Sequence, residues 1–435
     1  MIDGKECALR RDKLFETLQN DSIVILYAGV SIKKSAYQYY DFRVNSNFYY
    51  LTNISQEGSI LLISKQDGIV SECLFINEND PNLEKWVGRR LTLEEAKEAS
   101  GINNVLSLNM FNSELDLLLQ KKKSALERIK YVYLDLEKEN ILEDFNTTEN
   151  VKMSLSLNYP WLEFYDIYPQ IVALRQTKSN GEIVEIKNAI SDINIGIKAV
   201  LKRIRSEVYE YQLASLFDYT VKDYSNAKID RKTIVSSGAN SCSLGYKELN
   251  RKIKNNDLVM IECETKSNEY SASITRTFPV GKSFDESNIE LYKLVLNVNK
   301  MLISMIHPGI NLTDLNKIAV KNLAEGLVNL GIINNESEVK KYFYHPAVAH
   351  IGLDNPEPID PSAPLTSGSV LLVQPAVYIK EKELGIRIKD VVLVTDDGSY
   401  CVSNSIIKEI DDIEKAMGSR WWNINMYFLI SMEHY

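Results

Sequence analysis

An irregular stretch containing Pro160 and Pro169 divides this 435-residue chain into two segments with different patterns. Directly after it, Ser179 precedes a long amphipathic run over residues 182–204, which predicts a helix with a side-chain cap at its start. A break of this kind followed by a new helix is typical of a domain boundary, so we expect one near residue 170. The sequence therefore predicts one domain over residues 1–170 and a second over residues 171–417.

The first segment alternates strand-like and helical patterns. Strands are predicted over residues 23–27, 48–51, 60–63 and 131–136, and helices over residues 92–99 and 112–119. This alternation indicates a small α/β domain.

In the second segment helices and strands come in separate blocks. Helical runs over residues 182–204 and 209–225 precede strands over residues 233–236, 258–263 and 274–280. Further helical runs over residues 288–306 and 312–330 precede strands over residues 370–373, 376–379 and 391–394. Separate blocks favour an α+β fold, with a mostly antiparallel sheet that helices cover on one face.

Charge and composition exclude several classes of protein. The chain has 50 Lys and Arg against 59 Asp and Glu, a formal net charge of -9, so we expect neither a nucleic-acid nor a membrane partner. It lacks both a run of 18 apolar residues and a signal-peptide pattern, which predicts a cytoplasmic protein. Its five cysteines are widely spaced and form no CxxC pair, so reduced thiols are expected. The aromatic-rich tail, residues 418–435, could pack on a partner subunit, pack on its own domain, or be an appendage.

Several phrases together resemble the aminopeptidase P and prolidase family, whose catalytic half has the pita-bread fold. In the first segment these are FRVNSNFYYLT from Phe42 and WVGR from Trp86. In the second they are SITRTFPV from Ser273, VQPAVYI from Val373 and GIRIKD from Gly385. The resemblance implies a creatinase/aminopeptidase P type N-terminal domain followed by a pita-bread domain. Relatives commonly dimerise through the N-terminal domain, so it also implies a homodimer.

The resemblance gives five positions for the ligands of a dinuclear metal site, which in active members are two aspartates, a histidine and two glutamates. Of these, the first aspartate matches Glu262, while the second becomes a neutral hydroxyl at Ser273. The histidine of the HGxxHxxG segment is assigned to His350. The two glutamates match a neutral and a cationic residue, Gln374 and Lys389.

One carboxylate in place of four cannot hold two adjacent dications, so we expect no metal and no cofactor. The ammonium of Lys389 could instead pair with Glu262, since a buried charge is tolerated chiefly when it is paired. Two further family histidines are replaced, at Gly245 and Pro356. The residues expected to contact a ligand in the cleft are His345, Arg387, Gln374, Ser273 and Tyr246.

Three functions remain open. The first is a pseudo-Xaa-Pro-aminopeptidase whose cleft binds a peptide or a small carboxylate ligand. The second is a metal-independent enzyme of creatinase type that hydrolyses a C–N bond, with His350, Lys389 and Glu262 as catalytic residues. The third is a residual Xaa-Pro metallopeptidase with one ion on Glu262, His350 and either Glu264 or Asp354. Whether the chain is an enzyme is thus left open by its sequence.

Overall fold

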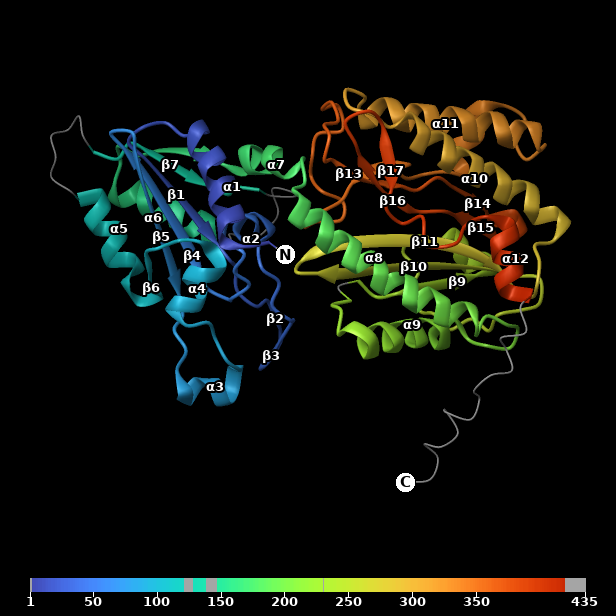
Figure 1. Cartoon of the computed structure of the whole chain (residues 1–435), viewed down its shortest axis with the longest axis horizontal. Helices are drawn as coiled ribbons and strands as arrows, with labels where there is room; N and C mark the ends of the chain where they lie inside the picture. The colour runs from blue at the N-terminus through green and yellow to red at the C-terminus, as the bar shows by residue number, and fades with distance from the viewer. Residues whose placement is uncertain (1, 121–127, 138–146, 230, 419–435) are drawn as a thin grey trace. The chain divides into compact units, whose positions relative to one another are not determined.

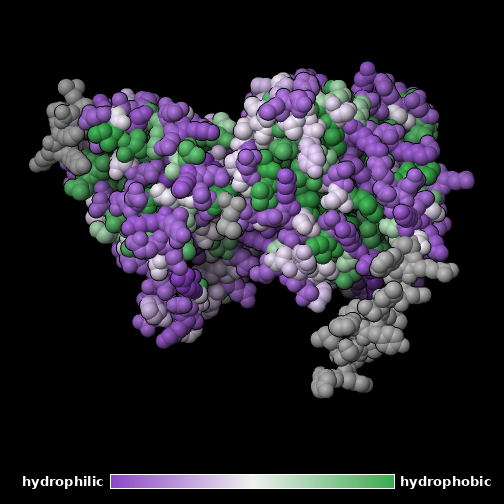
Figure 2. All heavy atoms as spheres, in the orientation of Figure 1, coloured by the Kyte–Doolittle hydropathy of each residue, from purple (hydrophilic) through white to green (hydrophobic). Residues whose placement is uncertain are grey.

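The computed structural model describes residues 2–120, 128–137, 147–229 and 231–418, so nearly all of the expected tail lies outside the described residues. The chain divides into two compact units, Met1–Arg175 and Gln176–Tyr435 (Figure 1). Within the described part, the helices are all too short or too polar to cross a membrane. Hydrophilic side chains cover most of the face drawn in Figure 2, and hydrophobic ones reach it in scattered patches.

A six-stranded mixed sheet forms the centre of the first unit, in the order β6-β5-β4-β1-β7-β8. Strand β1 pairs antiparallel with β4 and parallel with β7, and β4 and β5 form an antiparallel hairpin. The strands are β1 Ser22–Tyr27, β4 Ile60–Gln66, β5 Ile69–Ile76, β6 Val105–Ser107, β7 Tyr131–Leu134 and β8 Glu163–Asp166, and a separate small hairpin consists of β2 Lys33–Ser35 and β3 Gln38–Tyr39.

Helices surround this sheet. They are α1 Gly4–Thr17, α2 Ser46–Thr52, α3 Pro81–Val87, α4 Leu93–Ser100, α5 Phe111–Gln120, α6 Thr147–Asn158 and α7 Tyr168–Arg175, with a 3-10 turn at Leu108–Met110. Apolar side chains of α5 and α6 pack in one cluster with strand residues such as Ile25, Phe75 and Val132, all of them buried. Burial of such side chains is the main force that stabilises the unit.

The strand predicted over residues 48–51 is wrong, because this segment forms helix α2. Asn45 caps the helix, its side chain accepting a hydrogen bond from the amide of Phe48 at 2.9 Å. The segment is rich in aromatic residues, which favour strands, and Phe48, Tyr49, Tyr50 and Leu51 are all buried. With every position buried, hydrophobic periodicity could not distinguish a helix from a strand.

The second unit repeats one order of elements, two helices followed by strands. Helices α8 Asn180–Leu201 and α9 Glu210–Ser225 precede β9 Ile234–Ser237, β10 Leu258–Ser267 and β11 Tyr270–Pro279. Helices α10 Glu286–Met305 and α11 Leu312–Asn329 precede β12 Val348–His350, β13 Val370–Val373, β14 Ala376–Ile379, β15 Leu384–Arg387, β16 Asp390–Val394 and β17 Ser399–Cys401, and α12 Ile410–Gly418 follows. Short 3-10 turns lie at Gly238–Cys242, Glu336–Lys341 and Lys380–Lys382.

These strands lie between the helix pairs α8–α9 and α10–α11 (Figure 1). They form the antiparallel sheets β11-β10-β9, β12-β13-β16-β17 and β14-β15. A bridge between Thr275 and Lys389 joins β11 to the turn between β15 and β16, so the two halves of the unit meet at this point. The expected α+β architecture is confirmed, although the strands form three antiparallel sheets with helix pairs on either side and not one sheet covered on one face. Five of the predicted site residues gather at the strand junction.

A fully buried ion network anchors this junction. Arg276 of β11 donates to the carboxylate of Asp390 at 2.7 Å and to the backbone carbonyl of Lys389 at 2.7 Å. Lys408 and Ser403 donate to the same carboxylate at 2.6 and 2.7 Å. Because the charges are paired and hydrogen-bonded, they can remain buried and fix the backbone on both sides of Lys389.

Candidate functional site

Five of the predicted site residues meet where β10, β11 and β15 come together. Glu262 lies in the middle of β10 and Ser273 in β11, while Arg387 ends β15 and Lys389 follows it. Gln374 follows β13. Side chains along a strand alternate between its faces, so the carboxylates of Glu262 and Glu264 point to the same side of β10.

The ammonium of Lys389 occupies the centre of this group. Its Nζ donates to Oε1 of Glu262 at 2.6 Å and to Oγ of Ser273 at 2.9 Å. Arg387 donates to the other oxygen of Glu262 at 3.0 Å, and its second terminal nitrogen donates to the amide oxygen of Gln374. The expected ion pair between Lys389 and Glu262 is therefore present, and Arg387 adds a second cation to it.

The ionisation of Glu262 follows from these neighbours. Burial favours the neutral acid, but Lys389 and Arg387 outweigh it and lower the pKa of Glu262 to about 2. Burial raises the pKa of Glu264, whose carboxylate accepts from the side-chain amide of Asn355 at 2.6 Å. With both cations charged, the core formed by Glu262, Lys389 and Arg387 carries a surplus of positive charge.

These residues do not fit a pair of divalent cations. Lys389 places an ammonium against both Glu262 and Ser273, and the oxygen of Gln374 already accepts from Arg387. Throughout the described residues, His, Cys, Asp and Glu side chains nowhere form a group of three or more that could hold a metal ion. A metal ion at this place would have to displace the ammonium of Lys389 from both Glu262 and Ser273.

His345 lies beside the charged core. Its Nε2 is 2.9 Å from the hydroxyl of Tyr378, and its ring packs edge-on against Phe343 and Tyr378. Burial, together with the positive charge of Arg387 and Lys389, lowers the pKa of His345 to about 4, so the imidazole is neutral at pH 7. Tyr344 packs on Tyr378 with ring centroids 4.9 Å apart, and the four rings form an aromatic wall.

His350 is buried on β12, and the hydrogen-bond partners of Glu262 and Lys389 do not include it. The charged group that acts on it is Lys178, and burial lowers the pKa of its imidazole to about 3. Neither ring nitrogen makes a hydrogen bond to any part of the chain that the structure describes. The catalytic set of His350, Lys389 and Glu262 therefore stays a prediction, whereas a metal-holding group of Glu262, His350 and either Glu264 or Asp354 does not form among the described residues.

The spacing of the segment explains this placement. Counted from His345, the pattern HGxxHxxG puts its second histidine at Ala349 and its glycine at Gly352, without any shift. Side-chain alternation along β12 turns Ala349 to the face opposite His350. His345 is therefore the match for the first histidine, and alanine stands at the position of the second.

A pocket of about 310 Å³ opens on the outer side of Glu262. Its lining includes Glu262, Glu264 and Tyr246, the apolar side chains of Ile234 and Leu244, and three cations that the sequence patterns did not single out, Arg231, Lys232 and Lys247. Tyr246 is held in place because its hydroxyl donates to the buried carboxylate of Glu210 at 2.6 Å. A Cβ atom on Gly245 would meet nothing within 4 Å, so the loss of a histidine there leaves free space at the pocket.

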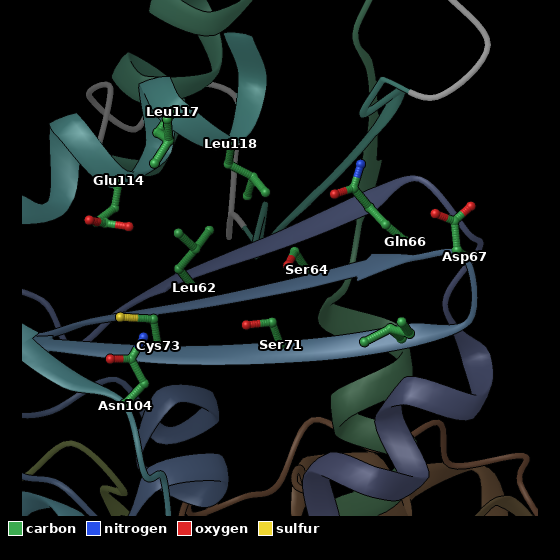
Figure 3. Close-up of a pocket in the computed structure, with 11 residues that line it drawn as sticks. Leu62, Ser64, Gln66, Asp67, Ser71, Cys73, Asn104, Glu114, Leu117 and Leu118 are labelled. Atoms are coloured by element: carbon green, nitrogen blue, oxygen red, sulfur yellow. The ribbon is translucent and has the colours of Figure 1, made fainter. Parts of the chain in front are cut away.

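A second hollow, of about 330 Å³, lies in the first unit between the β4–β5 hairpin and α5 (Figure 3). Ser64, Gln66 and Ser71 point into it from the strands, and Glu114 and Leu118 face them from the helix. The charged side chains that line it are both acidic, Asp67 and Glu114. It lacks the convergence of opposite charges that distinguishes the pocket beside Glu262.

Comparison with known proteins bears on both units. Residues 7–126 match the model of the aminopeptidase P N-terminal domain, and residues 185–396 match that of metallopeptidase family M24. A Xaa-Pro aminopeptidase from Haemophilus influenzae is 28% identical, over 96% of this chain and 98% of its own length. One from Escherichia coli is 27% identical, over the same shares of the two chains.

Solved structures also show similarity to aminopeptidase P over nearly the whole chain. A structure assigned to aminopeptidase P from Bacillus anthracis has 35% identity and a TM-score of 0.92, over 96% of this chain and 99% of its own. Aminopeptidase P from E. coli, solved with the inhibitor Pro-Leu, has 27% identity and a TM-score of 0.85, over 96% and 98% of the two chains. The expected N-terminal domain and pita-bread domain are thereby confirmed.

Proposed function

The chain belongs to the aminopeptidase P family, and we propose that it is a member that binds a peptide or a small carboxylate in its cleft without two catalytic metal ions. One observation carries this proposal. The ammonium of Lys389 lies 2.6 Å from Glu262 and 2.9 Å from Ser273, among the positions of the family's metal ligands. A positive charge built into the chain replaces the one that the metals would supply.

The remaining groups favour binding of an anion. Arg387 is 6% exposed, and its Nε has no hydrogen-bond partner in the described part of the chain. A guanidinium can bind a carboxylate through two parallel hydrogen bonds. The ring of Tyr344, which is 46% exposed, offers an apolar contact beside the neutral imidazole of His345, whose two nitrogens already bond Tyr378 and the carbonyl of Pro346.

Metal content and turnover of a Xaa-Pro peptide test the proposal. We expect elemental mass spectrometry to find far less than one ion per chain, both before and after soaking in Mn²⁺ and Zn²⁺. We also expect no release of the first residue from a Xaa-Pro peptide. One or more tightly bound ions per chain, with turnover, would show a residual Xaa-Pro metallopeptidase and overturn the proposal.

Ligand binding is the positive part of this test. Calorimetry with a Xaa-Pro dipeptide and with acetate should detect binding that the Arg387→Gln variant weakens by about tenfold or more. The matched control is Arg203→Gln, which removes an exposed guanidinium from another part of the same unit. Equal affinities for the two variants would exclude the carboxylate-binding role of Arg387.

Metal-independent hydrolysis is the second candidate, and the contact between Lys389 and Ser273 favours it. Burial and Arg387 lower the pKa of Lys389, although Glu262 opposes this. A lysine that loses its proton can act as a base on a neighbouring hydroxyl. If turnover of a C–N substrate is found in metal-free protein, it should disappear in Lys389→Met and also in Ser273→Ala.

A further inference from the structure

We infer that the pocket beside Glu262 selects ligands in which a short apolar segment connects two or more carboxylates. This inference rests on the proposed function, because the pocket shares Glu262 with the site of Lys389 and Arg387 and the inference names the class of ligand bound there. The shared chemistry is that of a small dicarboxylic acid or of the acidic end of a peptide.

The argument starts from the charge of the pocket. The net charge of the chain is -9, yet cationic side chains outnumber carboxylates around this cavity. Three cations line it, and two more are bonded to the carboxylate at its floor: Arg231, Lys232, Lys247, Arg387 and Lys389. The carboxylates among them are Glu262 and Glu264. A concave site with a surplus of one sign of charge concentrates ligands of the opposite sign.

The carboxylates of the pocket already have partners. Glu262 accepts from both Lys389 and Arg387. Glu264 accepts from Asn355 and lies 4.0 Å from the guanidinium of Arg231. Lys232 and Lys247 are not neutralised by these two acids, but backbone hydrogen bonds and both lysines lower the pKa of the neighbouring Glu248, whose carboxylate offsets part of their charge. Five cations then face three carboxylates, so a ligand with a single carboxylate would leave part of the positive surplus unpaired.

Arg231, Lys232 and Lys247 form a cationic rim around the pocket, and they come from two segments that are fixed to each other. Residues 231–232 precede β9, whereas residues 244–247 follow the turn at Gly238–Cys242. Nζ of Lys232 donates to the backbone carbonyl of Lys247 at 2.6 Å, which ties the segments together. A rim held in place before the ligand arrives loses less entropy on binding than two free lysines would.

Size and shape limit the ligand. The pocket holds about 310 Å³, at the lower end of the range for small-molecule sites. Ile234 and Leu244 supply apolar surface between the cations, and Gly245 leaves space beside them. These dimensions suit a short acid with a carboxylate at each end or one acidic residue of a peptide.

Calorimetry with succinate and with its half-amide, succinamate, tests the inference in the full-length protein. The two probes have nearly the same size and differ by one negative charge. We expect succinate to bind about tenfold more tightly at low salt, with a smaller ratio at high salt because exposed charges are screened. Equal affinities would overturn the inference.

A pair of lysine variants locates the effect. Lys247→Gln should lower the preference for succinate by about fivefold. Lys254→Gln, which removes an exposed charge away from the pocket, should leave it unchanged. Identical preferences in the two variants would overturn the inference even if succinate is favoured.

Binding of N-acetyl-Asp-Glu compared with that of succinate then tells whether a peptide or a free acid is preferred, and either result agrees with the inference.

The same data separate this inference from the proposed function. If succinate and succinamate bind equally well and Arg387→Gln weakens both, the proposed function stands and the preference for two charges is wrong. If neither probe binds and Arg387→Gln changes nothing, both fail.

Discussion

Among the residues of the candidate site, Glu262 has a carboxylate that pairs with two buried cations, Lys389 and Arg387. In a Glu262→Gln variant, Lys389 and Arg387 would keep their charges without a counter-ion. Loss of one partner from a buried ion pair costs about 3–5 kcal/mol. We expect a loss of this size in the free energy of unfolding, measured by urea denaturation.

The Lys389→Met variant is the control for this measurement. It removes one of the cations and leaves Glu262 paired with Arg387, so its loss of stability should be clearly smaller. A larger loss in Lys389→Met than in Glu262→Gln would contradict the assigned charges.

The ionisation of Glu262 also makes stability depend on pH. Its pKa falls from an ordinary value of 4.5 in the unfolded chain to about 2 in the folded one. The ion pairs therefore contribute fully above about pH 4.5, and this contribution is lost as the pH falls toward 2. The shift corresponds to about 3 kcal/mol.

Urea unfolding of the parent and of Glu262→Gln over this range isolates the effect, since other groups titrate in both proteins. Their difference in unfolding free energy should shrink steadily from pH 5 to pH 2. A difference that stays constant would mean that the pKa of Glu262 is the same in the folded and the unfolded chain.

At the scale of elements, the lost ligands lie on separate strands and can be restored one by one. The variant Ser273→Asp, Gln374→Glu, Lys389→Glu and Ala349→His, with Glu262 kept, would again have four carboxylates and an imidazole at the family positions. Without metal these carboxylates repel one another, so we expect the variant to be less stable than the parent.

Added Mn²⁺ should stabilise this variant, because an ion that binds only the folded state shifts the folding equilibrium. Thermal unfolding measures the effect, and the expected rise in Tm is several degrees in the variant and none in the parent. For a variant that does not fold alone, refolding with and without Mn²⁺ gives the same comparison. A variant that Mn²⁺ leaves unchanged would show that the cleft has lost more than its ligands.

Strand segments were predictable where the apolar run and the turn residues that flank it indicate the same boundaries. The strands at Val370–Val373 and Ala376–Ile379 match their predictions, because short apolar runs there end at turn residues. The helix over residues 48–51 was missed since complete burial removes periodicity.

The cationic rim could not be predicted, because Arg231 and Lys247 approach each other only through the fold, and nothing in their own segments shows it. His345 was expected in the cleft, and counting the motif from this first histidine would also have assigned its second histidine position to Ala349 and not to His350.

For the whole molecule, the resemblance led us to expect a homodimer, and we propose that the first unit provides the interface. None of the residues of α3 is buried, and Trp86 on this helix is 86% exposed. A short helix that buries nothing gains little from folding alone, and a large exposed aromatic side chain is typical of an interface.

Sedimentation at micromolar concentrations measures the association. Trp86→Ser should weaken it by about tenfold or more, because aromatic residues often dominate interfaces. Leu157→Ser, which alters a side chain that is 80% exposed on α6, serves as the control. Association that is equally strong in both variants would place the interface elsewhere.

The ammonium of Lys389 has one more consequence, for how the protein matures. An enzyme that needs two metal ions passes through an empty form and depends on the cell to load it with the correct ion. Here the central cation is a side chain of the polypeptide and is present as soon as the chain has been synthesised. It cannot be removed by a chelator, exchanged for a competing ion or lost in times of metal shortage, so the presence of the central cation does not depend on the metal supply of the cell.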